Sequence, residues 1–553
     1  MPTHLPYANG GRTRFPRSRA HEAALALLTF LLSCPSTLFP ADPPLRIDRI
    51  EIVRKDIFDT TKVEDRHIFG SVVNDLHVLT REDVVRRELL FKEGDELDET
   101  VLQESARNLR ALGYLGDVTI SSYAITETTA VIAVVTQDRW SIDMLPAYKQ
   151  EGGATAQRYT LKDDNFLGGG HSLSLSYSYQ TDRPSPHGTE VVFRERNLFG
   201  TRLQALLQQR NGWDQQRTAV ALEQTYYSDR TPWAGGIAAE FGRQKQVFYR
   251  DGIVAYDEET DRELQRGWFS MSFGSDALLR PVIGYLRIRS DYVDPRIYDN
   301  LDLVTISTSF LKRAFVERSC LNSSGRTEDM PLGFGAGVTL GRNFLAQGAS
   351  APRYVASVTL RHAMLLTDRF YLGWNASFQG YWGGSRKEES TVNVLLLHHL
   401  KISAFQTFVA QVNVVAGLGW SGRRQLLLGS STGLRGYGEK SFAGDRMITY
   451  GLEHRIFTSL NLLFFRVGGA LFLDGGTVWS GDAPPGRQRF SNAAGVGLRI
   501  ENTKVQGAGL IRIDWAMNLD ERKPGQIIIS SRLPFSAFLD LDSVVGLWSP
   551  EGE

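Results

Sequence analysis

The chain has 553 residues, of which 62 are basic and 62 acidic, so a net charge of zero gives no electrostatic sign of a nucleic-acid partner. Glycine (53 residues) and aromatic residues (10%) are abundant, as is typical of a chain with many strands and turns. No apolar run after residue 40 is long enough for a membrane-spanning helix, which argues against a helical membrane protein. A membrane β-barrel escapes that test, because only every second residue of each strand faces lipid.

Residues 1–40 have the features of an export signal. Four arginines between residues 12 and 19 precede a short apolar run at 23–32, and small residues follow it. We expect a cleaved signal peptide, whose cleavage point the sequence leaves open. Cys34 loosely fits a lipoprotein signal, although Pro35 is an unfavourable successor. The only other cysteine is Cys320, so removal of the signal would leave no intrachain disulfide.

Residues 45–140 have the pattern of a small soluble α/β domain. The predicted order is strand, helix, helix, strand, strand. The segments are 47–52, then 81–90 with Thr80 as helix cap, then a helix from about residue 99 to Gly113, then 118–120 and 130–135. Residues 54–79 form an insertion to which the sequence assigns no role. On pattern alone, any small α/β domain fits as well as a specific one.

From Trp140 onward the period of the apolar residues changes to two. Apolar and aromatic residues alternate with serines in 171–180, and the segments 303–311 and 511–517 alternate in the same way. Arginine and aspartate recur on one face of these long segments, and the core of a soluble sandwich could not bury those charges cheaply. The pattern therefore predicts a barrel with a polar lumen and a lipid-facing exterior. Residues 142–533 hold roughly sixteen to twenty candidate strands.

The most informative segment is a Gly/Ser-rich loop at 429–438 that contains the motif Leu434-Arg435-Gly436-Tyr437. In the strand-like segments that follow, Glu453 and Asp474 lie on the face that points inward, beside small glycines that leave room in the lumen. The loop with Arg435 is the nearest candidate to enter that space, because a guanidinium paired with carboxylates offsets its own desolvation.

These segments resemble a known family. The loop at 429–437, the strand with Glu453, and the segments 472–479 and 494–499 look like the BamA/TamA outer-membrane assembly superfamily, and 91–118 resembles its periplasmic POTRA domain. The resemblance implies one POTRA domain over 45–140, a transmembrane antiparallel β-barrel of about 16 strands over 141–535, and a C-terminal tail at 536–553. In that family the loop arginine contacts lumenal acids, which here implies that Arg435 pairs with Asp474 and Glu453. That group of three residues either only props the loop against the wall or also bears on substrate.

The resemblance also implies a location in the bacterial outer membrane, with the POTRA domain in the periplasm. The implied function is insertion of unfolded outer-membrane proteins, by pairing their strands at the seam between the first barrel strand (about 141–150) and the last (about 525–533). Periplasmic or lipoprotein accessory factors are further implied partners. The alternative is a pore that secretes one protein or passes solutes, since related secretion barrels share the POTRA domains and the loop motif. A single POTRA domain favours an accessory or specialised member. The interruption at Pro534 departs from the aromatic residue at which barrels of this family usually end.

No set of residues predicts catalysis. The stretch 429–433 fits the hydrolase pattern G-x-S-x-G, but the strand, elbow and helix which that pattern requires are not expected around it. His398 and His399 are neighbours in a strand and face opposite sides, so they cannot easily share a metal. We therefore expect no enzymatic activity, no cofactor and no metal.

Overall fold

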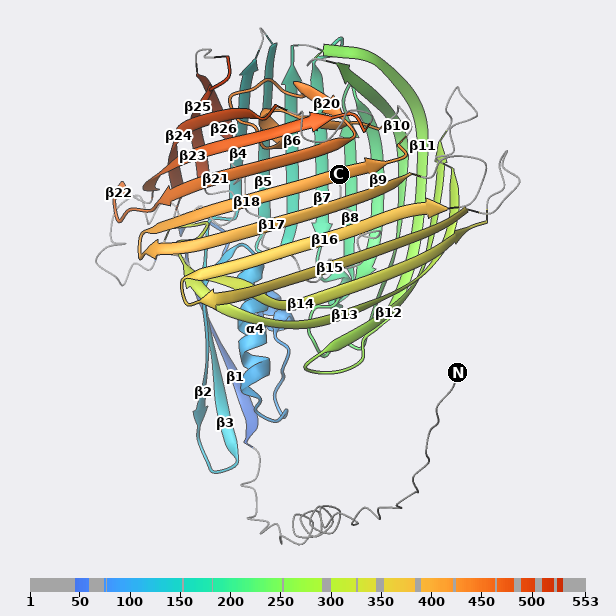
Figure 1. Ribbon diagram of the computed structural model, residues 1–553. Helices are drawn as coiled ribbons and strands as arrows, with labels where there is room; N and C mark the ends of the chain where they lie inside the picture. Colours follow the sequence, from blue (N-terminus) through green and yellow to red (C-terminus); the bar gives the residue numbers. More distant parts are fainter. Residues whose placement is uncertain are drawn as a thin grey trace, which may run out of the picture.

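The computed structural model describes residues 45–530 except 59–73, 76, 152–153, 182, 251–252, 291–299, 325–326, 345–352, 383–388, 421–423, 463–464, 482–488, 503–509 and 522–524. The predicted signal at 1–40, the tail at 536–553, Pro534 and most of the insertion at 54–79 lie outside the described residues. The described chain forms a small α/β module below one end of a large barrel (Figure 1).

The N-terminal module has the predicted order of elements. They are β1 Arg46–Lys55, α3 Glu82–Glu88, α4 Glu99–Ala111, β2 Leu115–Ala124 and β3 Thr129–Asp138. The sheet order is β1-β3-β2, with β1 parallel and β2 antiparallel to β3. One face of α4 buries Leu102, Ala106 and Leu109 against this sheet, as the 3.6-residue period predicted. Gly113, at φ 93°, follows the helix and turns the chain into β2.

The predicted cap of the first helix is wrong. The residue before α3 is Arg81, and no side chain caps the helix. The backbone N–H and the hydroxyl of Thr80 instead both donate to Oδ2 of Asp138, each at 2.7 Å. Asp138 is buried at the end of β3, where its carboxylate needs hydrogen-bond donors in place of water. Thr80 therefore bonds to Asp138 and does not cap α3. Burial raises the pKa of this carboxyl above its ordinary value, while the Thr80 bonds act in the opposite direction.

Twenty long strands of the described chain close into one ring. Each pairs antiparallel with its neighbour in the sequence, and β26 returns to β4. The strands are β4 Ile142–Glu151, β5 Ala154–Phe166, β6 His171–Gln180, β7 His187–Glu195, β8 Gln204–Asn211, β9 Gln215–Gln224, β10 Trp233–Arg250, β11 Ile253–Met271, β12 Leu278–Ser290, β13 Leu301–Ser319, β14 Thr327–Asn343, β15 Arg353–Thr367, β16 Phe370–Trp382, β17 Ser390–Ser403, β18 Gln406–Leu418, β21 Arg446–Ile456, β23 Phe465–Trp479, β24 Ser491–Asn502, β25 Leu510–Asn518 and β26 Gln526–Ser530. The two-residue β22 Asn461–Leu462 pairs at the foot of β23.

The barrel confirms the predicted architecture, but the predicted number of about 16 strands is wrong. The candidate strands beyond sixteen are part of the wall and not hairpins within loops. In the described chain, the only strand pair set apart in a barrel loop is the short one of β19 Leu426–Leu428 and β20 Phe442–Gly444. The ring has to include every long strand, because an unpaired edge facing lipid would leave backbone groups without hydrogen bonds.

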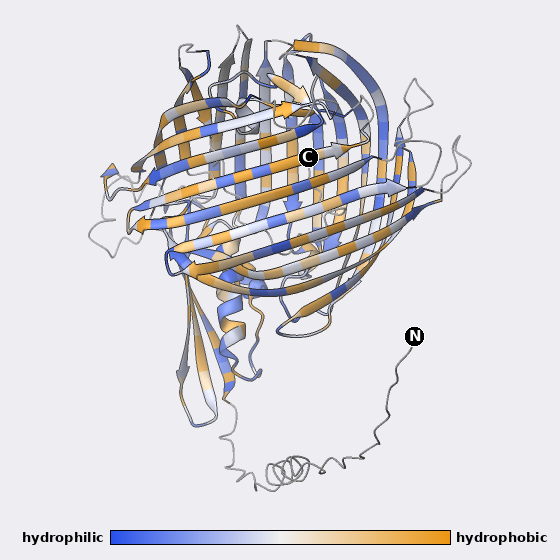
Figure 2. Ribbon diagram, viewed as in Figure 1, coloured by the Kyte–Doolittle hydropathy of each residue, from blue (hydrophilic) through white to orange (hydrophobic). Residues whose placement is uncertain are grey.

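The alternation of the strands sorts polar from apolar residues across the wall (Figure 2). In β13, Thr305, Ser307 and Ser309 are buried on the inner side. Between them Ile306 points outward and is 69% exposed. This is the arrangement of a polar lumen and a lipid-facing exterior. No helix in the described part of the chain is long and apolar enough to cross a membrane.

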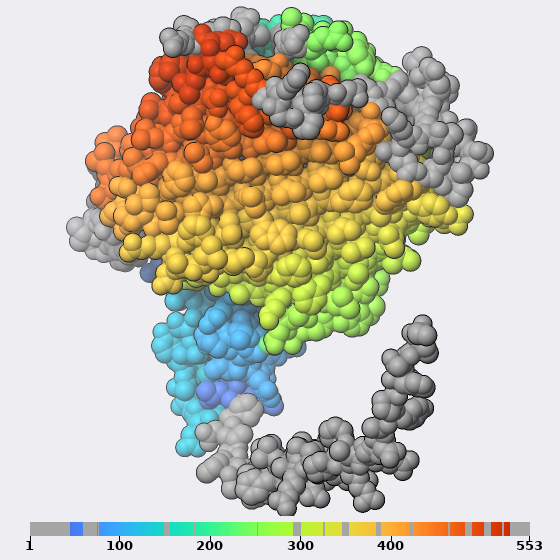
Figure 3. Space-filling view, in the orientation of Figure 1, coloured from blue at the N-terminus to red at the C-terminus, as the bar shows by residue number. Residues whose placement is uncertain are grey.

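The module docks on turns at the adjacent end of the barrel, and the space-filling view shows the two parts in contact (Figure 3). Asn165, at the end of β5 next to the β5–β6 turn, donates to the Thr80 hydroxyl at 2.8 Å. Asn197, in the β7–β8 turn, donates to Glu88 of α3 at 2.6 Å. Glu104 of α4 accepts from the backbone N–H of Asp229 in the β9–β10 turn at 2.9 Å. Three successive turns on one side of the barrel therefore hold the module.

Candidate functional site: a buried arginine in the barrel lumen

The motif lies in the long connection between β18 and β21, at the end of the barrel opposite the module. Residues Ser430–Thr432 form one 3₁₀ turn, and Gly433 and Gly436 follow with φ of 111° and 85°. At Gly436 a Cβ would meet the backbone of Met517 at 3.2 Å, so a side chain would hold the loop away from β25. Leu434 is fully buried and packs with Tyr437 in an apolar cluster. The loop is thus folded inward and fixed against the wall.

Arg435 is the polar centre of this arrangement. Its Nε and Nη2 donate to the two oxygens of Asp474, at 2.6 and 2.9 Å, as a bidentate pair. Its Nη1 donates to Glu453 at 3.1 Å and to Asp514 at 3.0 Å. The guanidinium also lies over the ring of Phe472, with 3.5 Å from Cζ to the ring centroid. One loop side chain therefore joins β21, β23 and β25.

The burial of these charges makes the site unusual. The side chain of Arg435 is 4% exposed, that of Asp474 is 1% exposed, and those of Glu453 and Asp514 are fully buried. Buried ions are tolerated only when partners replace the lost water. Three further arginines complete the set: Arg455 pairs with Glu453, Arg499 pairs with Asp514 and Glu453, and Arg512 pairs with Asp514. Four guanidinium groups thus surround three carboxylates.

Tyr437 fixes the other end of the motif. Its hydroxyl donates to the carbonyl of Asn492 at 3.2 Å and also to the carboxylate of Asp520, in the turn after β25. Burial and the nearby Asp520 raise the pKa of Tyr437 above its ordinary value, so the hydroxyl keeps its proton and remains a donor. All four motif residues consequently serve to attach the loop to β21–β25.

This geometry agrees with two sequence families. Residues 333–536 match the Omp85 superfamily domain, and residues 71–137 match a POTRA domain described as the surface antigen variable number repeat. The barrel of this chain therefore carries an Omp85 superfamily domain. The predicted resemblance to the BamA/TamA assembly barrels is thereby confirmed, and the N-terminal module is a POTRA domain.

Three solved structures show a similarity over most of this chain at low sequence identity. BamA from Haemophilus ducreyi lacking POTRA domains 1–3 is 13% identical with a TM-score of 0.38, and the match covers 88% of this chain and 83% of that chain. CdiB from Escherichia coli is 12% identical with a TM-score of 0.44, and the match covers 94% of this chain and 100% of that chain. CdiB from Acinetobacter baumannii is 12% identical with a TM-score of 0.41, and the match covers 88% of this chain and 73% of that chain. The comparison with curated proteins finds no match.

In this Omp85 barrel, sequence reasoning placed Glu453 and Asp474 beside Arg435 but missed Asp514. The alternation in β25 showed that Asp514 points inward, but not that it lies level with the loop. The cross-strand register supplies that information, because Asp514 pairs with Gly497 of β24. A Cβ at Gly497 would collide with Asp514 and Arg499. The glycine was therefore the available signal that a large group occupies this part of the lumen.

The hydrolase-like pattern at 429–433 lies in the loop that carries Arg435. Ser431, the central residue of the G-x-S-x-G pattern, donates to Glu439 at 2.6 Å within the loop. No group of three His, Cys, Asp or Glu side chains among the described residues could hold a metal ion.

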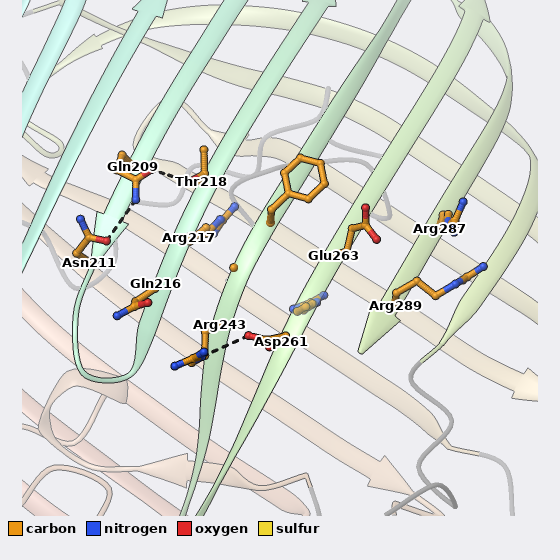
Figure 4. A pocket seen from close by; sticks show the side chains of 13 residues that line it. Gln209, Asn211, Gln216, Arg217, Thr218, Arg243, Asp261, Glu263, Arg287 and Arg289 are labelled. Atoms are coloured by element: carbon orange, nitrogen blue, oxygen red, sulfur yellow. Dashed lines mark hydrogen bonds and ion pairs between the residues drawn. The ribbon is translucent and has the colours of Figure 1, made fainter. Parts of the chain in front are cut away.

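A separate groove of about 710 Å³ lies on β8–β12 (Figure 4). Phe241 and the Arg243–Asp261 ion pair line it, and they share the face of β10 and β11 on which the exposed Ile237 points outward. The groove is therefore on the outer surface and not at the Arg435 site.

Proposed function

We propose that this protein lies in the bacterial outer membrane, with its POTRA domain in the periplasm, and assists the insertion of other β-barrel proteins at the seam between β26 and β4. The observation that supports this most is the shortness of that seam. In the described chain β26 and β4 pair at two positions, Ile528 with Lys149 and Ile529 with Tyr148. On its other side, β4 pairs with β5 at ten positions.

A short seam has a direct physical consequence. Backbone groups that lack a partner in the hydrocarbon region cost free energy, and an added strand satisfies them. Among the described residues, opening the two residue pairs of this seam sacrifices fewer hydrogen bonds than opening any of the longer pairings in the ring. An unfolded client strand would therefore pair at the β4 or β26 edge more readily than elsewhere on the wall.

The Arg435 site supports such a seam from one side. It ties β21, β23 and β25 together through Glu453, Asp474 and Asp514, and β25 is the hydrogen-bonded neighbour of β26. A firm wall up to β25 would restrict the opening to the last strand. In this proposal Arg435 positions the wall and does not contact the client.

The partners follow from this role. They are outer-membrane lipid, unfolded β-barrel clients, and periplasmic or lipoprotein accessory factors. Strand pairing is non-covalent, so the proposed function requires no catalytic residue, no cofactor and no nucleic acid.

The test is a covalent lock on the seam. Tyr148→Cys and Ile529→Cys are combined, because these positions are directly paired and point to the same face of the sheet. Purified protein in liposomes is oxidised, and the rate at which an unfolded client barrel becomes folded and protease-resistant is measured. We expect acceleration by the unmodified protein, loss of the acceleration on oxidation, and recovery on reduction.

The matched control joins Val358→Cys to Phe378→Cys, a paired position in the middle of β15–β16. The same bond there should leave the acceleration unchanged. Equal acceleration by the oxidised and reduced seam variants would contradict insertion at the seam. No acceleration at all, with a large steady conductance, would favour the secretion or solute pore.

A further inference from the structure

One hairpin of the barrel leaves the wall at the POTRA end. The pairing of β13 with β12 stops at Leu311, and the pairing of β14 with β15 stops at Gly333. Beyond these points β13 and β14 continue to pair only with each other, out to Ser319 and Thr327. We call residues 312–324 and 327–332 the hairpin arm. Its two strands are therefore free to take a path that the neighbouring strands do not share.

The tip of the arm is folded around one carboxylate. Glu328 accepts hydrogen bonds from the backbone N–H groups of Leu321, Asn322 and Ser323, at 3.0 to 3.2 Å. The side chains of Asn322 and Ser323 also donate to it, at 2.8 and 3.2 Å. Glu328 is buried. A carboxylate with this many donors holds the tip in one conformation.

The tip reaches the opposite side of the opening. The carbonyl of Cys320 accepts from Thr407 of β18 at 2.7 Å, and the carbonyl of Leu321 accepts from Arg455 of β21 at 2.9 Å. The backbone N–H of Ser324 donates to Glu501 of β24. Six long strands (β15, β16, β17, β18, β21 and β23) separate β14 from β24 around the ring. An arm rooted in β14 can touch β24 only by crossing the opening.

Apolar contacts seat the arm on the inner wall as well. Leu321 and Met330 of the arm are buried with Ala363 of β15 and Tyr371 of β16. Tyr371 additionally donates to the carbonyl of Pro331 at 3.4 Å. Inward-facing residues of a water-filled barrel would normally be polar, so this apolar patch is explained by the arm that covers it.

The POTRA domain contacts the same arm through two arginines of α4. Arg110 of α4 donates twice to Asp329 of β14, at 3.0 and 3.1 Å, and pairs with Glu317 of β13 at 3.2 Å. One turn earlier, Arg107 lies over the ring of Phe315, with 4.9 Å from Cζ to the ring centroid. The last turns of α4 thus hold both strands of the arm.

The geometry points to a plug: the hairpin arm closes the POTRA end of the barrel to solutes, and α4 of the POTRA domain is the element whose movement releases it. Arg455 links the plug to the loop at the other end, because its Nε donates to Glu453, the acceptor that also binds Arg435. The plug does not depend on the proposed function, since a closed opening can be measured without any client.

Native Cys320 reports the state of the arm, because it lies at the tip and is 6% exposed. The experiment uses the full chain in a Cys34→Ser background and measures two quantities: conductance across a planar bilayer and the rate at which a bulky maleimide labels Cys320. For the parent we expect low steady conductance and slow labelling. Glu328→Ala removes the acceptor of the tip and should raise both by about tenfold or more, where tenfold corresponds to about 1.4 kcal/mol.

Arg110→Ala weakens the grip of α4 and leaves the tip intact. Because this ion pair is partly exposed, we expect an increase of about two- to fivefold. The matched control is Arg87→Ala, which removes an arginine that pairs with Asp83 within α3 and leaves the contacts of the arm in place. Heat-dependent gel mobility of each variant verifies that the barrel is folded.

Two results would overturn the plug. One is a parent protein with high steady conductance and rapid Cys320 labelling. The other is a folded Glu328→Ala or Arg110→Ala variant with the conductance and labelling rate of the parent. Client insertion is assayed separately, so a failure of the plug and a failure of the insertion proposal are distinguishable.

Discussion

Two sets of ion pairs hold this molecule together, and they differ in burial. Around Arg435 every acidic partner is at most 1% exposed, and the pairs join strands of one wall. At the junction of the POTRA domain and the barrel, Arg110 and Asp329 are 19% and 21% exposed, and Arg230 and Asp98 are 64% and 37% exposed. Buried pairs are costly to break, whereas exposed pairs contribute little and exchange readily with water. The difference indicates that the loop with Arg435 is held permanently in the lumen. The junction of the POTRA domain and the barrel, which we call the joint, can instead adjust its ion pairs.

The largest effect on stability is expected for Arg435→Ala, which leaves three buried carboxylates without their shared partner. We expect the free energy of unfolding in lipid vesicles to fall by about 3–5 kcal/mol. Arg435→Lys should recover only part of the loss, because an ammonium cannot reproduce the bidentate bond to Asp474. Arg489→Ala is the control, since Arg489 is 83% exposed and pairs with Asp520 in the same sector. If Arg435→Ala lowers the free energy of unfolding no more than the control does, Arg435 does not hold the loop in the lumen.

The sequence could predict the components of this site better than their assembly. Alternation placed Glu453 and Asp474 on the inward face, because the side-chain period of a strand is strictly two. The family resemblance implied that Arg435 pairs with them. Alternation could not place Asp514, since the position of an acid along the lumen depends on the register between strands. The wrong count of about 16 came from the family resemblance, whereas the alternation itself offered sixteen to twenty candidate strands. Only closure of the ring, which depends on all strands together, selects twenty.

The hairpin arm shows a second limit of sequence reasoning. Residues 312–319 are still part of β13, and no Gly or Pro marks the point after Leu311 where the strand leaves β12. Thr80 is a third case, because its natural role as a helix cap gave way to a buried carboxylate distant in sequence. In each case a contact between residues distant in sequence determined the local structure: the path of β13 after Leu311, and the hydrogen-bond partner of Thr80.

A smaller effect is expected from one of the buried bonds of the junction, that between Asn197 and Glu88. Asn197→Ala removes one donor but leaves Arg202, which pairs with Glu88 at 2.7 Å. We expect a loss of about 1–2 kcal/mol in the free energy of unfolding of the POTRA domain in the full chain, measured by hydrogen exchange of α3. Asn211→Ala, at the far end of β8, should have no such effect. If protection of α3 is unchanged in Asn197→Ala, then α3 is not held by the barrel.

The smallest effect concerns pH at the exposed side of the joint. A hydrogen bond from the Thr100 side chain, together with Arg230, lowers the pKa of Asp98 to about 2. Because the folded pKa lies below the unfolded one, this stabilisation is present above about pH 4 and is lost as pH falls towards 2. Asp98 is more than one third exposed, so solvent screening should limit the contribution to less than about 1 kcal/mol.

Asp98→Asn keeps a side-chain oxygen to cap α4 but cannot titrate, so the free energy of unfolding should vary less between pH 4 and 2 than in the parent. Unfolding by urea across that range measures the difference. Identical pH profiles would show that Asp98 and Arg230 do not interact in solution, and the joint would then rest on its buried contacts alone. A reduced slope would instead show that protonation of Asp98 costs stability at the start of α4, where Asp98 accepts hydrogen bonds from Thr100 of the helix and from Arg230 of the barrel.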